Sequence, residues 1–211
     1  MKMPPPIILL GGLENDATSS TYAQAVALTV FSAFAIIVLI IPAIWHYRVN
    51  NVAACSLIFY LSIYNFTTFV NTIIWPRDNY SDWWDGQILC DIEVKLEWPF
   101  TTGLACAMAC ITRNLAIVLD VERANIHSTK AMRYRKLMID LAICFVIPIL
   151  QIALHYISQP SRYYISVIGG CTPPYDRSWP TIVLFYMWPT IFSLINCYYA
   201  SKLLCLMIFI I

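Results

Sequence analysis

The stretch YAQAVALTVFSAFAIIVLIIPAIWHY, Tyr22–Tyr47, contains no aspartate, glutamate, lysine or arginine. A helix needs about 20 predominantly apolar residues to cross the hydrocarbon core of a bilayer, and this stretch is longer than that. It therefore predicts a transmembrane helix over about residues 22–47. Four more spans are predicted at about residues 52–75, 88–121, 137–157 and 179–211, the second of these four beginning with charged turns before its apolar part.

The composition of the whole chain agrees with this pattern. Of the 211 residues, 60% are hydrophobic and 12% are charged, whereas soluble domains carry about 25% charged residues. We therefore expect an all-α membrane protein, a polytopic bundle of transmembrane helices that follows an N-terminal tail over residues 1–21. Lysine and arginine form no continuous basic face, so a nucleic-acid partner is not expected.

The basic residues of the loops predict the orientation of the chain. Short loops that carry lysine and arginine stay in the cytoplasm. Six basic residues lie in the first and third loops, whereas the N-terminal tail and the other two loops carry fewer basic residues and several acidic ones. These six are Arg48, Arg123, Lys130, Arg133, Arg135 and Lys136. The pattern predicts an extracellular N-terminus.

The cysteines separate into two groups. Six of the eight lie within predicted spans, where a small apolar side chain serves helix packing. Cys90 and Cys171 fall on the predicted outer side, in an oxidising compartment. A disulfide between them is favoured there over two free thiols, which is the alternative.

The sequence does not predict an enzyme. His46 and His127 are on the predicted inner side and His155 is near the outer side, so no histidine converges with a nucleophile and an acid. There is no HExxH, CxxC or glycine-rich phosphate loop. We expect no catalytic residue, metal or cofactor. A small membrane transporter or a structural membrane protein without a ligand is one possible class, although the spans carry few ionisable groups between their ends.

The stretch GQILCDIEVKLEWP, Gly86–Pro99, carries four charges on alternate positions, just before the apolar part of the third span. On a helix, Asp91 and Lys95 are i,i+4 neighbours that can pair. Glu93 and Glu97 lie on another face, where no cation follows. One interpretation places all four charges in the lipid headgroup layer. The other places them at the outer mouth of a ligand pocket.

Three other residues each have two interpretations. Trp83 and Trp84, in the loop before this stretch, are either interfacial anchors or ligand contacts. Arg113, near the inner end of the third span, either extends to the headgroups or takes part in a functional switch.

Long blocks of the chain resemble the fungal receptors for lipid-modified peptide mating pheromones, the a-factor receptor family of class D G-protein-coupled receptors. The blocks are WWDGQILCDIEVKLEW, CITRNLAIVLDVERA, RYYISVIGGCTPPYD and SWPTIVLFYMWP, and the likeness extends from about Pro42 to Tyr199. The resemblance implies a seven-span receptor of the plasma membrane. Its implied partners are a farnesylated, carboxymethylated peptide pheromone, a heterotrimeric G protein and, as a further candidate, a receptor oligomer.

The resemblance also implies roles for particular residues. It pairs Cys90 with Cys171. The implied ligand contacts are Trp83, Trp84, Asp91, Glu93, Lys95 and Glu97. The implied G-protein-facing residues are Arg48, Arg113, Arg123, Arg133, Arg135 and Lys136. Because the chain stops at Ile211 after a fifth apolar stretch, we expect a truncated form that holds five of the seven spans and does not signal alone.

Overall fold

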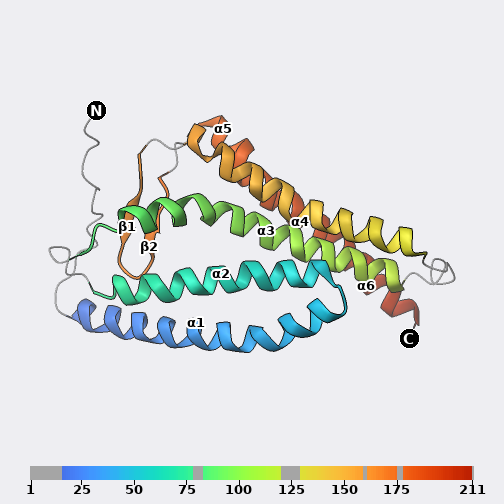
Figure 1. The fold of residues 1–211 in the computed structure, drawn as a ribbon, viewed down its shortest axis with the longest axis horizontal. Helices are drawn as coiled ribbons and strands as arrows, with labels where there is room; N and C mark the ends of the chain where they lie inside the picture. The colour runs from blue at the N-terminus through green and yellow to red at the C-terminus, as the bar shows by residue number, and fades with distance from the viewer. Residues whose placement is uncertain (1–15, 78–82, 120–128, 159–160, 175–177, 211) are drawn as a thin grey trace.

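The computed structural model describes residues 16–77, 83–119, 129–158, 161–174 and 178–210. These residues form five long helices and one short hairpin (Figure 1). The helices are α1 (Asp16–Arg48), α2 (Val52–Ile74), α3 (Gln87–Leu119), α4 (Lys130–Ser158) and a continuous fifth helix made of α5 (Trp179–Thr181), η2 (Ile182–Tyr186) and α6 (Met187–Ile210). The hairpin, β1 (Tyr164–Ser166) and β2 (Gly170–Thr172), lies between α4 and α5.

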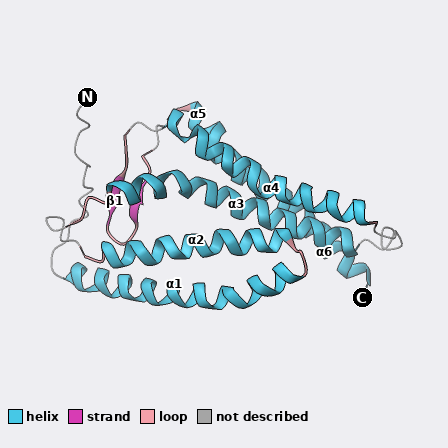
Figure 2. Cartoon of the chain, in the orientation of Figure 1, coloured by secondary structure: helices cyan, strands magenta, loops and turns pink. Residues whose placement is uncertain are grey.

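Each of these five helices is long and apolar enough to cross a membrane. Figure 2 shows that helices account for nearly all of the described chain. The fold class is therefore the predicted one, and the chain is a multi-pass membrane protein.

The predicted fourth span, residues 137–157, is part of a longer helix. The sequence predicts Arg133, Arg135 and Lys136 in a loop. In the structure, helix α4 begins at Lys130, so these three residues lie on its first turns. Hydropathy detects only the part of a helix that lies in hydrocarbon. Lysine and arginine are good helix formers, so the helix continues beyond that part.

Helix α3 is the centre of the bundle. It packs against α2, α4 and α6, whereas α1 packs on α2 (Figure 1). Small buried side chains line α3, among them Gly103, Ala107 and Cys110, and small residues allow helix backbones to approach closely.

At one such close approach, a side chain of α2 passes over α3 and forms a hydrogen bond with α4. Pro148 lies inside α4 and has no N–H, so the carbonyl of Cys144, one turn earlier, lacks its helical donor. The hydroxyl of Tyr60 on α2 donates to that carbonyl at 2.7 Å. The Tyr60 ring passes over Gly103 of α3, where a Cβ atom would lie 2.3 Å from the ring. The carbonyl of Cys144 therefore has a hydrogen-bond donor even though Pro148 cannot supply one.

Near a second proline, a side chain of a neighbouring helix again donates a hydrogen bond to a backbone carbonyl. Pro189 follows a widened turn, η2, in which the N–H of Met187 donates to the carbonyl of Ile182. Pro189 cannot donate to the preceding turn. The side-chain amide of Gln151 on α4 donates to the carbonyl of Leu184 at 2.9 Å. Helices α4 and η2 are thus joined by a buried polar contact.

Candidate functional site

The disulfide end of the bundle, defined as the end that holds Cys90 and Cys171, contains the hairpin and the first turns of α3. The structure confirms the predicted bond between these two cysteines, whose Cα atoms are 5.1 Å apart. Because Cys90 lies on the first turn of α3 and Cys171 lies in β2, the bond fixes the hairpin beside α3.

The hairpin is also held by α2. Its strands pair antiparallel, with Ile165 opposite Cys171. At its tip, the N–H of Ile168 donates to the carbonyl of Trp75 at 3.0 Å, and the Asn71 amide donates to the carbonyl of Gly169 at 3.2 Å. The hairpin therefore spans the ends of α2 and α3.

Aromatic side chains support the segment that precedes α3. Trp75 is fully buried, and its indole donates to the carbonyl of Trp84 at 3.2 Å. The hydroxyl of Tyr163 donates to the carbonyl of Asp85 at 2.8 Å. Burial raises the pKa of Tyr163, which keeps this hydroxyl protonated as a donor. The segment that enters α3 is thereby joined both to α2 and to the chain before β1.

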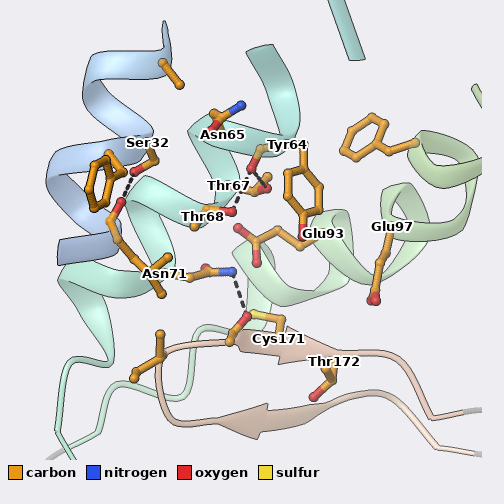
Figure 3. Close-up of a pocket in the computed structure, with 16 residues that line it drawn as sticks. Ser32, Tyr64, Asn65, Thr67, Thr68, Asn71, Glu93, Glu97, Cys171 and Thr172 are labelled. Carbon is orange, nitrogen blue, oxygen red and sulfur yellow. Dashed lines mark hydrogen bonds between the residues drawn. The ribbon is translucent and has the colours of Figure 1, made fainter. Parts of the chain in front are cut away.

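A cavity of about 560 Å³ lies at this end, between α1, α2, α3 and the hairpin (Figure 3). Its volume falls within the usual range of ligand pockets. Its polar lining residues are Ser32, Tyr64, Asn65, Thr67, Thr68, Asn71, Glu93, Glu97 and Thr172. Its apolar lining residues are Leu28, Phe31, Ala35, Phe100, Ile168, Gly169 and Cys171.

Glu93 is the buried carboxylate of the cavity. Figure 3 shows its side chain directed from α3 towards Thr68 and Asn71 of α2. It is 7% exposed, and neither of its oxygens accepts a hydrogen bond from a described residue. The Oδ1 atom of Asn71 is also buried without a donor, because the Asn71 amide nitrogen is directed to Gly169. The Asn71 amide nitrogen lies close enough to Glu93 to interact with it, but its hydrogen bond goes to Gly169, so these three acceptor atoms have no donor of their own among the described residues.

The other predicted ligand contacts separate into two groups. Glu97 lines the cavity one turn after Glu93, with its side chain directed away from Asn71. The remaining residues lie outside the cavity lining. These residues are Trp83, Trp84, Asp91 and Lys95.

Asp91 has a different partner from the one predicted. Both of its carboxylate oxygens accept from the guanidinium of Arg162, at 2.8 Å for Nε, and the Lys95 side chain is exposed. The segment that leads into β1 brings Arg162 to α3, and a planar guanidinium fits a carboxylate in a two-bond arrangement. The i,i+4 spacing on the helix could not reveal this competitor.

Sequence reasoning missed the contribution of α2 to the cavity. Tyr64, Thr68 and Asn71 line it, and they stand at i, i+4 and i+7 on one face of that helix. The signal was the polar run YNFTTFVNT, residues 64–72, inside an otherwise apolar span. Polar groups in the middle of a span usually face a cavity or one another.

The Arg113 end of the bundle, defined as the end that holds Arg113 and Asp140, has a second polar cluster. Arg113 on α3 forms a 2.7 Å ion pair with Asp140 on α4. The other carboxylate oxygen of Asp140 accepts from Asn114 at 2.8 Å, and the thiol of Cys110 lies 3.2 Å from the first. Of the two interpretations of Arg113, the structure does not favour extension to the headgroups, because a buried acid on the neighbouring helix pairs with it.

Four of the other basic residues predicted to face a G protein lie near this end. Arg48 is exposed at the last turn of α1. Arg133, Arg135 and Lys136 are exposed on the first turns of α4. Arg123 lies outside the described residues. The start of α4 therefore presents a cluster of cations that is separate from the Arg113–Asp140 pair.

Comparison with known proteins gives one consistent result. Residues 27–210 match a family model described as pheromone A receptor. The chain is 33% identical over 170 residues to the pheromone a factor receptor of Saccharomyces cerevisiae, covering 81% of this chain and 36% of that protein. It is 33% identical over 163 residues to the pheromone B beta 1 receptor of Schizophyllum commune, covering 77% and 29%. It is 26% identical over 171 residues to pheromone receptor 1 of Mycosarcoma maydis, covering 81% and 46%.

The chain spans less than half the length of each of these three relatives. No solved structure matches it.

Proposed function

The chain belongs to the pheromone A receptor family, and from this premise we propose that it acts as a plasma-membrane receptor for a peptide mating pheromone and activates a heterotrimeric G protein. The observation that carries the proposal is the cavity at the disulfide end. It is large enough for part of a peptide, and it combines an apolar wall with unpaired acceptors. Its walls come from three helices and a disulfide-linked hairpin, an arrangement suited to binding a ligand in one orientation.

The ligand we propose is a farnesylated, carboxymethylated peptide. Leu28, Phe31 and Ala35 on α1 and Phe100 on α3 form an apolar wall for a prenyl chain. Each buried CH₂ of such a chain contributes about 0.8 kcal/mol. The peptide part would then meet the polar residues of α2 and α3.

Within the predicted contact residues, Glu93 and Glu97 are the ones we assign to the cavity. Trp83, Trp84 and Asp91 with Lys95 would contact only a peptide that extends beyond the cavity lining. The proposal thus separates residues that contact the buried part of the ligand from residues that contact only an extended peptide.

The distribution of charge supports an extracellular N-terminus. Arg48 and the cluster Arg133, Arg135 and Lys136 lie on one side of the bundle, and segments rich in lysine and arginine stay in the cytoplasm. The cavity and the disulfide then face outward, where a disulfide persists.

The G-protein contact we propose is the exposed start of α4. Replacing Arg133, Arg135 and Lys136 together with glutamine should reduce signalling, while pheromone binding and surface expression stay at wild-type level. Wild-type signalling by the triple variant would leave these residues with a role in topology alone.

A pheromone-pathway reporter tests the main proposal. The protein is expressed from its complete gene in cells that lack their own receptor, and they are exposed to the peptide of the opposite mating type with and without its farnesyl group. We expect the reporter to respond to the farnesylated peptide and to respond weakly or not at all to the unmodified one. A protein that reaches the surface but neither binds the farnesylated peptide nor activates the reporter would contradict the proposal and favour a transporter or structural role.

A further inference from the structure

The cavity at the disulfide end has an uneven distribution of charge. Two carboxylates, Glu93 and Glu97, line it, and no lysine or arginine occurs among the described residues that do so. The remaining polar lining consists of hydroxyl and amide groups. The charged groups on this lining are thus both acids, and acidic groups in a cleft favour a cationic guest over an anionic one.

Glu93 has the strongest need for a partner. It is 7% exposed, and no described residue donates to either oxygen. A carboxylate removed from water without a hydrogen bond or a counter-charge is unfavourable by several kcal/mol. The acceptor Oδ1 of Asn71 lies in the same cavity and is also unpartnered. Any group that satisfies this site must carry several N–H donors and preferably a positive charge.

We infer that Glu93 is the counter-charge for a cationic group of the peptide ligand, an ammonium or a guanidinium, whose remaining N–H groups are accepted by Asn71. The inference rests on the proposed function and specifies the chemistry that the ligand must present. The cation would enter beside α2, because Glu93 is directed towards Thr68 and Asn71 (Figure 3). The apolar wall on α1 would hold a neighbouring apolar part of the same ligand.

Glu97 provides a matched comparison on the same helix. It lines the same cavity one turn later, but it keeps more solvent-accessible surface than Glu93 and its side chain is directed away from Asn71. Because the Glu97 carboxylate is directed away from Asn71, a ligand cation placed between Glu93 and Asn71 gains less from Glu97 than from Glu93. The same substitution at both positions therefore separates a specific ion pair from the general field of the cavity.

The test is a cycle of receptor and ligand variants in the reporter cells described above. The probes are synthetic farnesylated, carboxymethylated peptides with the pheromone sequence of the opposite mating type. In one series, the α-amino group and each lysine or arginine are neutralised in turn. Each peptide is applied to the wild-type protein, Glu93→Gln and Glu97→Gln, with surface expression measured in parallel.

We expect Glu93→Gln to raise the half-maximal concentration of the native peptide by about tenfold to a hundredfold, as for loss of a buried charge pair. Glu97→Gln should change it less than about threefold. For one neutralised peptide, the half-maximal concentration on the wild-type protein should rise by the same factor. On Glu93→Gln, that peptide should be no weaker than the native peptide. This non-additivity identifies the group that pairs with Glu93.

Two results would overturn the inference alone. One is a native peptide that acts on Glu93→Gln as well as on the wild type, and the other is a series in which no neutralisation weakens the wild-type response. The second result needs no variant protein, so poor folding of Glu93→Gln cannot obscure it. Failure of the wild-type protein to respond to any peptide of the series would instead overturn the proposed function, and the inference with it.

Discussion

Glu93 and Asp140 are buried carboxylates at opposite ends of the bundle, and their surroundings differ. Asp140, 4% exposed, has three partners on α3: Arg113, Asn114 and Cys110. Glu93, 7% exposed, has no hydrogen-bond donor among the described residues. A paired and hydrogen-bonded charge can hold two helices in one register, whereas an unpaired one opposes folding.

The difference supports the division that we propose, in which Asp140 serves the bundle and Glu93 serves a ligand. Proteins retain groups that oppose folding where function requires them. Asp140 therefore belongs to the architecture of the α3–α4 contact, and Glu93 belongs to the cavity. The predictions below test this division, beginning with the largest expected effect.

The most severe change should be Asp140→Ala. It leaves the largely buried Arg113 without its ion pair, and breaking a buried pair typically lowers the free energy of unfolding by about 3–5 kcal/mol. Arg113 keeps some contact with solvent, so we expect the lower part of this range. Thermal denaturation in detergent, together with surface expression, measures the loss.

Glu93→Gln is the control for that experiment. Removing an unpaired buried charge should leave the melting temperature unchanged or raise it. Equal destabilisation by Asp140→Ala and Glu93→Gln would contradict the division between the two carboxylates.

The second change removes the covalent brace of the cavity. The double variant Cys90→Ser/Cys171→Ser should lose about 2–4 kcal/mol of stability, because the bond closes a long loop in the unfolded chain. It should also weaken the pheromone response, because the hairpin forms one wall of the cavity. Dose–response curves and melting curves, recorded with and without reductant, measure both effects.

In this experiment, reductant should affect the wild-type protein and leave the double variant unchanged. Mass spectrometry of unreduced peptides should detect the Cys90–Cys171 link directly. Two alkylatable thiols in the native protein would refute it.

A neutral buried acceptor provides the third test. Tyr60→Phe leaves the carbonyl of Cys144 without a donor, because Pro148 cannot supply one. An orphaned buried acceptor of this kind costs about 1–3 kcal/mol. The melting temperature should fall, and Tyr156→Phe, at a side chain that is 88% exposed, should not change it. An unchanged melting temperature in Tyr60→Phe would show that the carbonyl finds another donor.

The smallest effect is expected for a third carboxylate, Asp91, which is paired but partly exposed. Its partner Arg162 can be replaced in Arg162→Gln. Exposed ion pairs contribute little to stability, and salt screens them. Melting curves at low and high salt should differ more for the wild type than for the variant. A loss as large as that of Asp140→Ala would mean that burial does not control the strength of these pairs.

Part of the candidate site was predictable. Cys90 and Cys171 are the two cysteines predicted on the outer side of the membrane, so a disulfide between them was favoured over two free thiols, and the structure contains it. For Glu93 and Glu97 the sequence left two interpretations, the headgroup layer and the mouth of a pocket, and in the structure both residues line the cavity. The hairpin was not predicted, because strands of three residues are too short to show an alternating pattern.

The sequence by itself determined the five long helices, because a run of about 20 apolar residues in a bilayer must satisfy its own backbone hydrogen bonds, and a helix does so within one segment. Only the tertiary structure decided which polar groups meet. Helical periodicity shows which residues share a face, but it does not show which helix lies against that face. Arg113 thus pairs with Asp140, Asp91 pairs with Arg162 in place of Lys95, and Glu93 faces an α2 surface whose Asn71 amide donates to Gly169.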